Sequence, residues 1–152
     1  VASSVVSLFA HVIDEVVALA FLMPVVAGLS GNAGSQALAV SVRAIAERDL
    51  EGPLVRRAIR REALTAMING TIIAWSAALI VLLWFHNPTI SVVIGLSMMI
   101  TFTWAGLVGI LAPLTLKRFG ADPAVASSVF VLTTIDMASF FVFLGLASLM
   151  LL

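Results

Sequence analysis

Four long apolar stretches determine what this chain can fold into. They cover roughly residues 16–46, 62–84, 89–116 and 123–151, and each has at least the about 20 residues that an α-helix needs to cross the hydrocarbon core of a bilayer. Hydrophobic residues make up 62% of the 152 positions and charged residues only 11%, so a soluble domain could not cover this apolar surface. We therefore predict an all-α, polytopic membrane helix bundle.

The stretch at residues 1–10 is also apolar but is too short to cross a membrane. We expect it to be the tail of a truncated first span, so that the bundle has four complete spans plus this tail. No charged region precedes "VASSVVSLFA", which argues against a signal peptide. The sequence contains no cysteine, which excludes disulfides, thiolate chemistry and Cys-based metal sites.

The polar links between the spans predict the orientation of the bundle. They are "HVIDE" at 11–15, "ERDLEGPLVRRAIRRE" at 47–62, "HNP" at 86–88 and "KRFGADP" at 117–123. If the spans alternate in direction, every Lys and Arg of the chain falls on the same side. The positive-inside rule then places the basic links in the cytoplasm and the C-terminus outside, as in a multi-pass protein of the cell (inner) membrane.

Four arginines of the second link have the spacing of a helix face. Arg56 and Arg57 are each followed by another arginine four residues later, at Arg60 and Arg61. We expect the link to be an amphipathic helix lying at the cytoplasmic surface, with arginines suited to lipid phosphates. The alternative is ordinary positive-inside charge. Eight basic residues balance eight acidic ones, so the net charge says nothing about partners. We expect no nucleic-acid partner.

The first complete span contains an unusually polar stretch, "PVVAGLSGNAGSQ" at 24–36. On a helix, Pro24, Gly28, Asn32 and Gln36 share one face because they recur every four residues. Pro24 and the glycines of this stretch permit a kink or local unwinding, which membranes tolerate where the backbone faces protein or water. The alternative is helix packing, with small residues allowing close approach and amides bonding a neighbour.

Two other groups of small and polar residues are expected to serve packing alone. One is the stripe of Ser97, Thr101, Ala105 and Gly109, spaced four residues apart in the segment 89–116. The other is the pair formed by Asn69 and Gly70 in the segment 62–84.

Asp136 is the only acidic or basic side chain deep within a predicted span. Burying a charge there costs at least about 2.5–3.5 kcal/mol, and such a residue normally marks an ion path. Thr133 and Ser139 flank it, and no Lys, Arg or His lies at similar depth, so the carboxyl group is either protonated and structural or meets a cation. Asp122 lies fourteen residues earlier on a similar face, roughly 21 Å away, and is suited to cap the last helix before Pro123.

Four motifs then follow one another in a specific order. They are the proline with G-x-x-G-N-x-G-x-Q in the first complete span, "RAIAERDL" after it, "LKRFGADPAVAS" before the last span and "TTID" within it. Together they resemble the MgtE family of magnesium channels and transporters over essentially all 152 residues. The resemblance implies homodimers with five spans per subunit and a pore between the subunits. Spans 16–46 and 123–151 are then expected to line most of that pore.

Members of this family typically also have a cytosolic N-terminal domain and paired CBS domains that sense magnesium. These domains are absent from residues 1–152, so we expect the whole chain to be one MgtE-like transmembrane pore domain. It is then either the membrane part of a longer protein or a naturally short member.

The resemblance also implies roles for single residues. Asp136 matches the pore aspartate of the central magnesium site, the carbonyl of Leu132 matches a backbone ligand there, and Asp122 matches a cytoplasmic acidic residue that binds magnesium near the regulatory domain. The expected pore-lining residues are Gly28, Gly31, Asn32, Gln36, Ser128 and Thr133. There are two departures: Ser30 replaces a glycine common in the family motif, and "SSVF" at 127–130 lacks the Asn-Pro pair of some members, which weakens Ser128 as a gate residue.

Magnesium chemistry agrees with this assignment. Mg²⁺ prefers six oxygen ligands and gives up its water reluctantly, so a pore for the hydrated ion needs few protein ligands. A twofold axis would double the single aspartate. We therefore expect transport of Mg²⁺ or another divalent cation, with a cation-coupled exchanger as the alternative.

No enzymatic activity is expected. A membrane-embedded hydrolase would need a nucleophile with a base or paired metal ligands, and neither histidine lies within a span. A purely structural bundle would have little use for Asp136.

Overall fold

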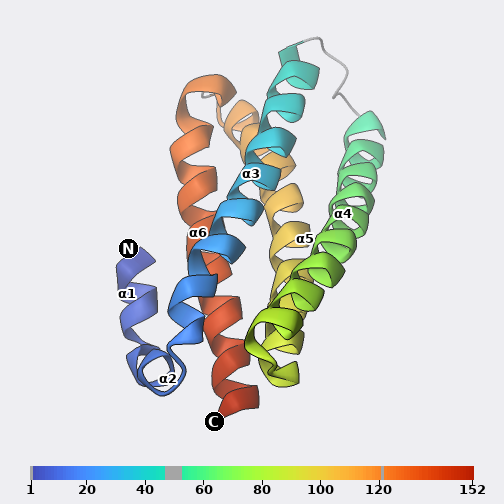
Figure 1. Ribbon diagram of the computed structural model, residues 1–152. Coiled ribbons are helices and arrows are strands. Elements are labelled where there is room, and N and C mark those ends of the chain that lie inside the picture. Colours follow the sequence, from blue (N-terminus) through green and yellow to red (C-terminus); the bar gives the residue numbers. More distant parts are fainter. Residues whose placement is uncertain (1, 47–52, 121) are drawn as a thin grey trace.

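The computed structural model describes residues 2–46, 53–120 and 122–152, and within them it contains helices and no strands (Figure 1). The helices are α1 (Ala2–Ser7), α2 (Ala10–Glu15), α3 (Ala18–Ala46), α4 (Pro53–Phe85), α5 (Pro88–Arg118) and α6 (Pro123–Leu151). The last four are long and apolar enough to cross a membrane, which confirms the predicted all-α bundle with four complete spans.

The turn between α4 and α5 is specified by the "HNP" link. His86 has a positive φ of 52°, which reverses the chain. Asn87 then caps α5, because its side-chain oxygen accepts hydrogen bonds from the backbone N–H groups of Thr89 (2.9 Å) and Ile90 (3.2 Å). Pro88 occupies the first helical position, where a missing N–H has no cost.

Helix α3 is continuous from Ala18 to Ala46, with Pro24 inside it. The local unwinding that the glycines permit therefore does not occur. A proline removes one hydrogen bond of the helix ladder, and the surrounding turns keep their helical conformation across it.

The predicted surface helix in the second link is wrong in one respect. The arginines belong to α4 itself, which runs without a break from Pro53 to Phe85. Between Leu54 and Asn69 the sequence has no glycine or proline and is rich in Arg, Ala, Leu and Glu, all good helix formers, so nothing ends the helix at the membrane surface. Residues 47–52 of that link, including Arg48, lie outside the described residues.

Helix α5 is the centre of the bundle and packs against α3, α4 and α6, whereas α3 and α4 share few contacts. Figure 1 shows α3 crossing in front of α5. The largest core cluster joins the halves of the helices nearer the α4–α5 turn. Its fully buried side chains include Leu19, Ile94, Met98 and Phe143.

The short helices lie at one end of the molecule. Helix α1 packs against α6, on the side of the bundle away from α4 (Figure 1). The rings of Phe9 and Phe141 meet edge to face there, with centroids 5.8 Å apart. The six residues of α1 do not cross the bundle by themselves, in line with the prediction for residues 1–10.

The small-residue stripe of α5 packs as predicted. A Cβ placed on Gly109 would lie 2.7 Å from Ala37 Cβ and 2.8 Å from the carbonyl oxygen of Gly34, so α3 and α5 cross in close contact there. One turn before Gly34 on α3, the hydroxyl of Ser30 donates a 2.7 Å hydrogen bond to Thr101 of α5. Both residues are buried, with exposed fractions of 0% and 1%.

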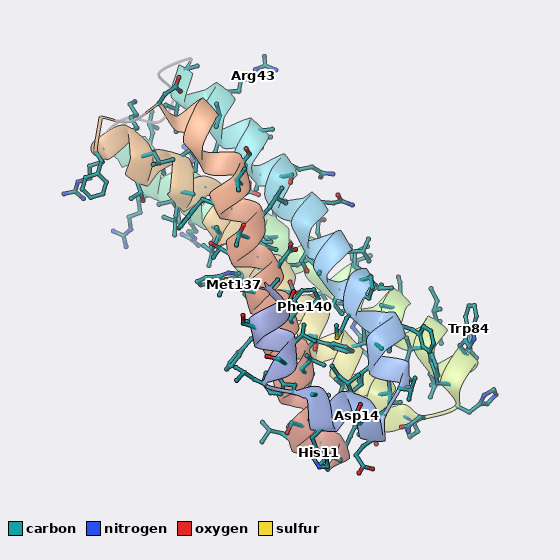
Figure 2. The ribbon with its side chains drawn as sticks, turned by 90° about the vertical axis from the view of Figure 1, so that its left-hand side faces the viewer. His11, Asp14, Arg43, Trp84, Met137 and Phe140 are labelled. Atoms are coloured by element: carbon teal, nitrogen blue, oxygen red, sulfur yellow. The ribbon has the colours of Figure 1, made fainter. Side chains whose placement is uncertain are left out.

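The ends of the bundle differ in charge. Figure 2 shows Arg43 at one end and His11, Asp14 and Trp84 at the other. Lys117 and Arg118 close α5 at the same end as Arg43, since α3 and α5 both run toward it. This separation of charge is what the sequence predicts for a membrane bundle.

Candidate functional site

One face of α3 is polar and uncovered within the single chain. Gly28, Asn32 and Gln36 are all exposed. A Cβ placed on Gly28 would meet nothing within 4 Å, whereas a Cβ on Gly34 would run into the side chain of Ile135 on α6. Gly34 is therefore a packing glycine, and Gly28 keeps space open at the surface of the chain.

Gly31 joins this face to α6. The Cδ2 atom of Leu132 lies 3.6 Å from the position of a Cβ on Gly31, which is ordinary contact. Leu132 is 40% exposed, and Asp136 follows it by one helical turn on the same side. The uncovered face of α3 and the Leu132–Asp136 side of α6 thus belong to neighbouring helices in contact.

Asp136 is half-buried, and its carboxyl group has no hydrogen bond or ion pair with another described residue. One turn later, the buried hydroxyl of Ser139 also has no partner in the described part of the chain. Other buried helical serines, such as Ser41 and Ser97, donate to the carbonyl four residues earlier. Unpartnered buried polar groups are rare, so the Ser139 hydroxyl, one turn from Asp136, singles out this stretch of α6 as a candidate site.

The remaining predicted residues lie near Asp136 in the sequence or just before the start of α6. Thr133 and Ser128 are exposed. Asp122 is exposed and directly precedes Pro123, the first residue of α6, which is the position of a helix cap. It lies at the basic end of the bundle, shortly after Lys117 and Arg118.

The amides of α3 also line a groove toward α4. A cavity of about 450 Å³ lies between the two helices, and its polar lining comes from Asn32, Gln36, Thr65, Asn69 and Glu62. Phe102 and Gly106 of α5 form its floor. Within one chain, Asn32 and Gln36 are therefore grouped with α4 side chains, a grouping that helix periodicity alone does not reveal.

The prediction that Asn69 and Gly70 both serve packing is half right. A Cβ on Gly70 would lie 2.7 Å from Phe102 Cβ, so Gly70 does allow α4 and α5 to approach closely. Asn69 is exposed and faces the groove, so its packing role is wrong. Both residues are adjacent in sequence, but successive positions on a helix point about 100° apart.

Glu62 was not identified from the sequence because it stands at the edge of a charged link. It lines the groove, and its Oε1 atom lies 3.8 Å from the position of a Cβ on Gly106. It also lines a second cavity of about 690 Å³ nearer the basic end, together with Arg57 and Arg61. Its helical register with Thr65 and Asn69 was the available signal.

The described part of a single chain does not gather enough ligand side chains for a metal site of its own. Within residues 2–46, 53–120 and 122–152, no group of three or more His, Cys, Asp or Glu side chains could hold a metal ion. Asp136 provides one carboxylate, with the exposed hydroxyl of Thr133 and the backbone of Leu132 nearby in sequence. Such a donor set suits a hydrated cation that contacts few protein oxygens.

Comparison with known protein families identifies the family of the chain. The family model for MgtE, described as a divalent cation transporter, matches residues 23–146. The chain belongs to the MgtE family. The matched region extends from the start of the polar face of α3 to beyond Asp136 on α6, so it includes both halves of the candidate site.

Three curated MgtE proteins are similar to nearly the whole chain. The magnesium transporter MgtE of Enterococcus faecalis is 35% identical over 146 residues, or 96% of the chain. Those of Bacillus subtilis and Thermus thermophilus are 31% and 35% identical over 97% and 99% of the chain. The chain spans about a third of the length of these relatives, 32–33%.

Proposed function

We propose that this protein transports Mg²⁺ across the membrane through a pore formed between two copies of the chain. The observation that carries the proposal is Asp136, a half-buried carboxylate within an apolar span that has no partner among the described residues. The similar curated proteins are named magnesium transporters, which supports the choice of ion.

A second copy of the chain would supply a second carboxylate to the ion. Because one chain offers a single carboxylate at this depth, a twofold axis beside α3 and α6 would place two Asp136 side chains on opposite sides of one ion. The carbonyl of Leu132 has a lone pair beyond its helical hydrogen bond and can face the water shell of the ion. Mg²⁺ would then pass largely hydrated, which avoids the cost of stripping its water.

The uncovered face of α3 would form the rest of the wall. The proposed lining comprises Gly28, Gly31, Asn32 and Gln36 of α3 with Ser128 and Thr133 of α6. Asn32 and Gln36 also line the groove toward α4, so this groove would be continuous with the pore wall. Gly31 would contribute through its contact with Leu132. Gly28 would set the width of the pore, since it has open space around it. The amide of Asn32 would bond the water carried by the ion.

Asp122 would act at one mouth of the pore. It is exposed at the basic end of the bundle, where its carboxylate can attract cations before they enter the membrane. By the positive-inside rule we place this end in the cytoplasm of a cell whose inner membrane holds the protein.

Flux into liposomes tests the transport mechanism. With a magnesium gradient and no other ion gradient, we expect uptake that follows an imposed membrane potential. Strict dependence on a proton or sodium gradient would instead show a coupled exchanger and contradict the passive pathway.

Cross-linking tests the dimeric pore. The chain has no cysteine, so Thr133→Cys introduces a single thiol on the proposed subunit interface. We expect it to form a disulfide-linked dimer in the membrane under mild oxidation. The control, Trp75→Cys on exposed α4, should stay monomeric. Equal cross-linking of both variants would argue against an interface at α6.

A further inference from the structure

The arginines at the start of α4 lie between two hollows of the surface. Arg57, Arg61 and Thr65 line the cavity of about 690 Å³ that lies between α3 and α4, and the same three residues line an adjoining cavity of about 400 Å³. Arg60 joins them in the smaller cavity. Three arginines are thus carried at neighbouring positions of one continuous helix.

The length of α4 sets the depth of these groups in the membrane. Its 33 residues extend about 50 Å, well beyond a hydrocarbon core of about 30 Å. Trp84 is 77% exposed near the other end, where aromatic side chains mark the membrane interface. About 20 residues back from Trp84, the hydrocarbon region ends near Leu64 and Thr65, so the arginines lie in the headgroup layer.

Apolar side chains continue both hollows toward the membrane interior. In the smaller one, Leu64 and Ile68 are exposed one to two turns below the arginines. In the larger one, Val40 of α3 and Ile110 of α5 provide apolar walls. From the start of α4 toward the membrane interior, the surface presents guanidinium groups, then the hydroxyl of Thr65, then alkyl side chains.

The charge of the larger cavity is mixed but positive. Glu62 lines it, with its carboxylate folded toward Gly106 of α5. Two guanidinium groups oppose this single carboxylate, and the lining of the smaller cavity contains three arginines and no acidic residue. An anionic ligand is therefore favoured over a cationic one.

We propose that this surface is a binding site for one anionic glycerophospholipid. Its phosphate would bind Arg57 and Arg61, with Arg60 on the outer side. An ester carbonyl would accept a hydrogen bond from Thr65, and an acyl chain would lie along Leu64 and Ile68. Basic pockets beside membrane helices bind acidic headgroups in this way, and the order of chemical groups along α4 matches a phospholipid from head to tail.

Native mass spectrometry of the detergent-solubilised 152-residue protein tests the site. The protein is equilibrated with equal amounts of phosphatidylglycerol and phosphatidylcholine with identical acyl chains. We expect one phosphatidylglycerol to be retained per chain with at least about tenfold preference, because Arg–phosphate contacts and net charge both favour it. Arg57→Gln with Arg61→Gln should bring this preference close to parity. Arg118→Gln, which removes one charge at the same end but outside both cavities, should keep it.

Two further variants separate the site from general surface charge. Glu62→Gln should increase the preference for phosphatidylglycerol a few-fold, since it removes the opposing carboxylate. Leu64→Ser should weaken retention, whereas Ile100→Ser, with nearly equal exposure (47% against 45%), should not. Equal loss with Arg118→Gln and the double arginine variant would overturn the proposal.

Competition identifies the ligand. Inorganic phosphate and glycerophosphoglycerol, which lacks acyl chains, should fail to displace the lipid at millimolar concentration. Displacement by either would show a site for the phosphate group alone and overturn the role of the apolar walls. Loss of the preference whenever the protein dimerises would assign the arginines to a subunit contact, which would also overturn the lipid site.

Discussion

Helix α3 is arranged differently toward α5 and toward α4. Against α5 it is in close contact, with Gly34 and Ala37 pressed on Gly109 and a buried hydrogen bond between Ser30 and Thr101. Toward α4 it leaves a groove of about 450 Å³ lined by amides, a hydroxyl and a carboxylate. The same helix thus uses small residues where it packs and polar residues where it does not.

This difference separates two uses of glycine that look alike in sequence. At a helix crossing in a membrane, glycine gives van der Waals contact that a larger side chain would prevent. On the uncovered face, a Cβ added to Gly28 would meet nothing within 4 Å, so no neighbouring helix requires a glycine there for close packing within the chain. Substitutions at the two kinds of position should therefore have different consequences, and this can be measured.

The largest effect is expected for Gly109→Leu. The new Cβ alone would lie 2.7 Å from Ala37 Cβ and 2.8 Å from the Gly34 carbonyl oxygen, so α3 and α5 must separate. Overpacking a core costs about 1–3 kcal/mol or more, and we expect a marked fall in the thermal unfolding temperature in detergent. Gly145→Leu, at a glycine with open surroundings, is the control. Equal stability of the two variants would contradict the close crossing.

Gly28→Leu should spare stability and impair transport. Because nothing lies within 4 Å of an added Cβ, the unfolding temperature should match that of the parent. A leucine on the proposed pore wall should nevertheless reduce Mg²⁺ flux into liposomes by about tenfold or more. Gly145→Leu should leave flux unchanged. If both variants conduct normally, Gly28 does not line the path.

Ser30→Ala should have a moderate effect on the packed side of α3. It removes the 2.7 Å hydrogen bond to Thr101 without changing the volume of the crossing much. Buried hydrogen bonds between membrane helices contribute about 0.6–2 kcal/mol, so we expect a small fall in stability and normal magnesium affinity. A double-mutant cycle with Thr101→Val measures the pair. Additive effects would show that the two hydroxyls do not interact.

The smallest effect is expected for Asp122→Ser. Serine keeps an oxygen suited to capping, a role worth about 0.5–2 kcal/mol, but removes the charge. Stability should therefore hold, while the apparent magnesium affinity drops a few-fold at low ionic strength. This drop should shrink as salt screens the mouth of the pore. A tight, salt-insensitive site at Asp122 would contradict the proposed weak attraction.

The architecture of this chain could be predicted well from its sequence because membrane insertion leaves few choices. Apolar length set the four spans, and the structure confirms them within a few residues at most ends, for example Pro123–Leu151 for the last span. The start of α4 was missed because hydropathy reports only the part of a helix that lies in lipid. The helix itself continues through residues of high helix propensity to Pro53.

The surroundings of the candidate site could be predicted only in part. Periodicity showed that Gly28, Asn32 and Gln36 share a face, but it could not show which neighbour covers that face or leaves it open. Gly31 and Gly28 are three residues apart, yet a Cβ added to Gly31 would contact Leu132 of α6, whereas one added to Gly28 would meet nothing within 4 Å. Asn69 was misassigned for the same reason, since its orientation toward a groove depends on how α4 packs on α5.

The most direct test of the central claim is magnesium binding by Asp136→Asn in the 152-residue protein. The amide keeps the shape of the side chain and removes its charge, so the fold should persist. The apparent affinity for Mg²⁺, followed by flux or by NMR shifts during titration, should fall at least about tenfold, or about 1.4 kcal/mol. Asp14→Asn, an exposed acid at the opposite end from the basic links, should leave the titration unchanged. A magnesium titration of Asp136→Asn that matches the parent would contradict an ion site at this residue.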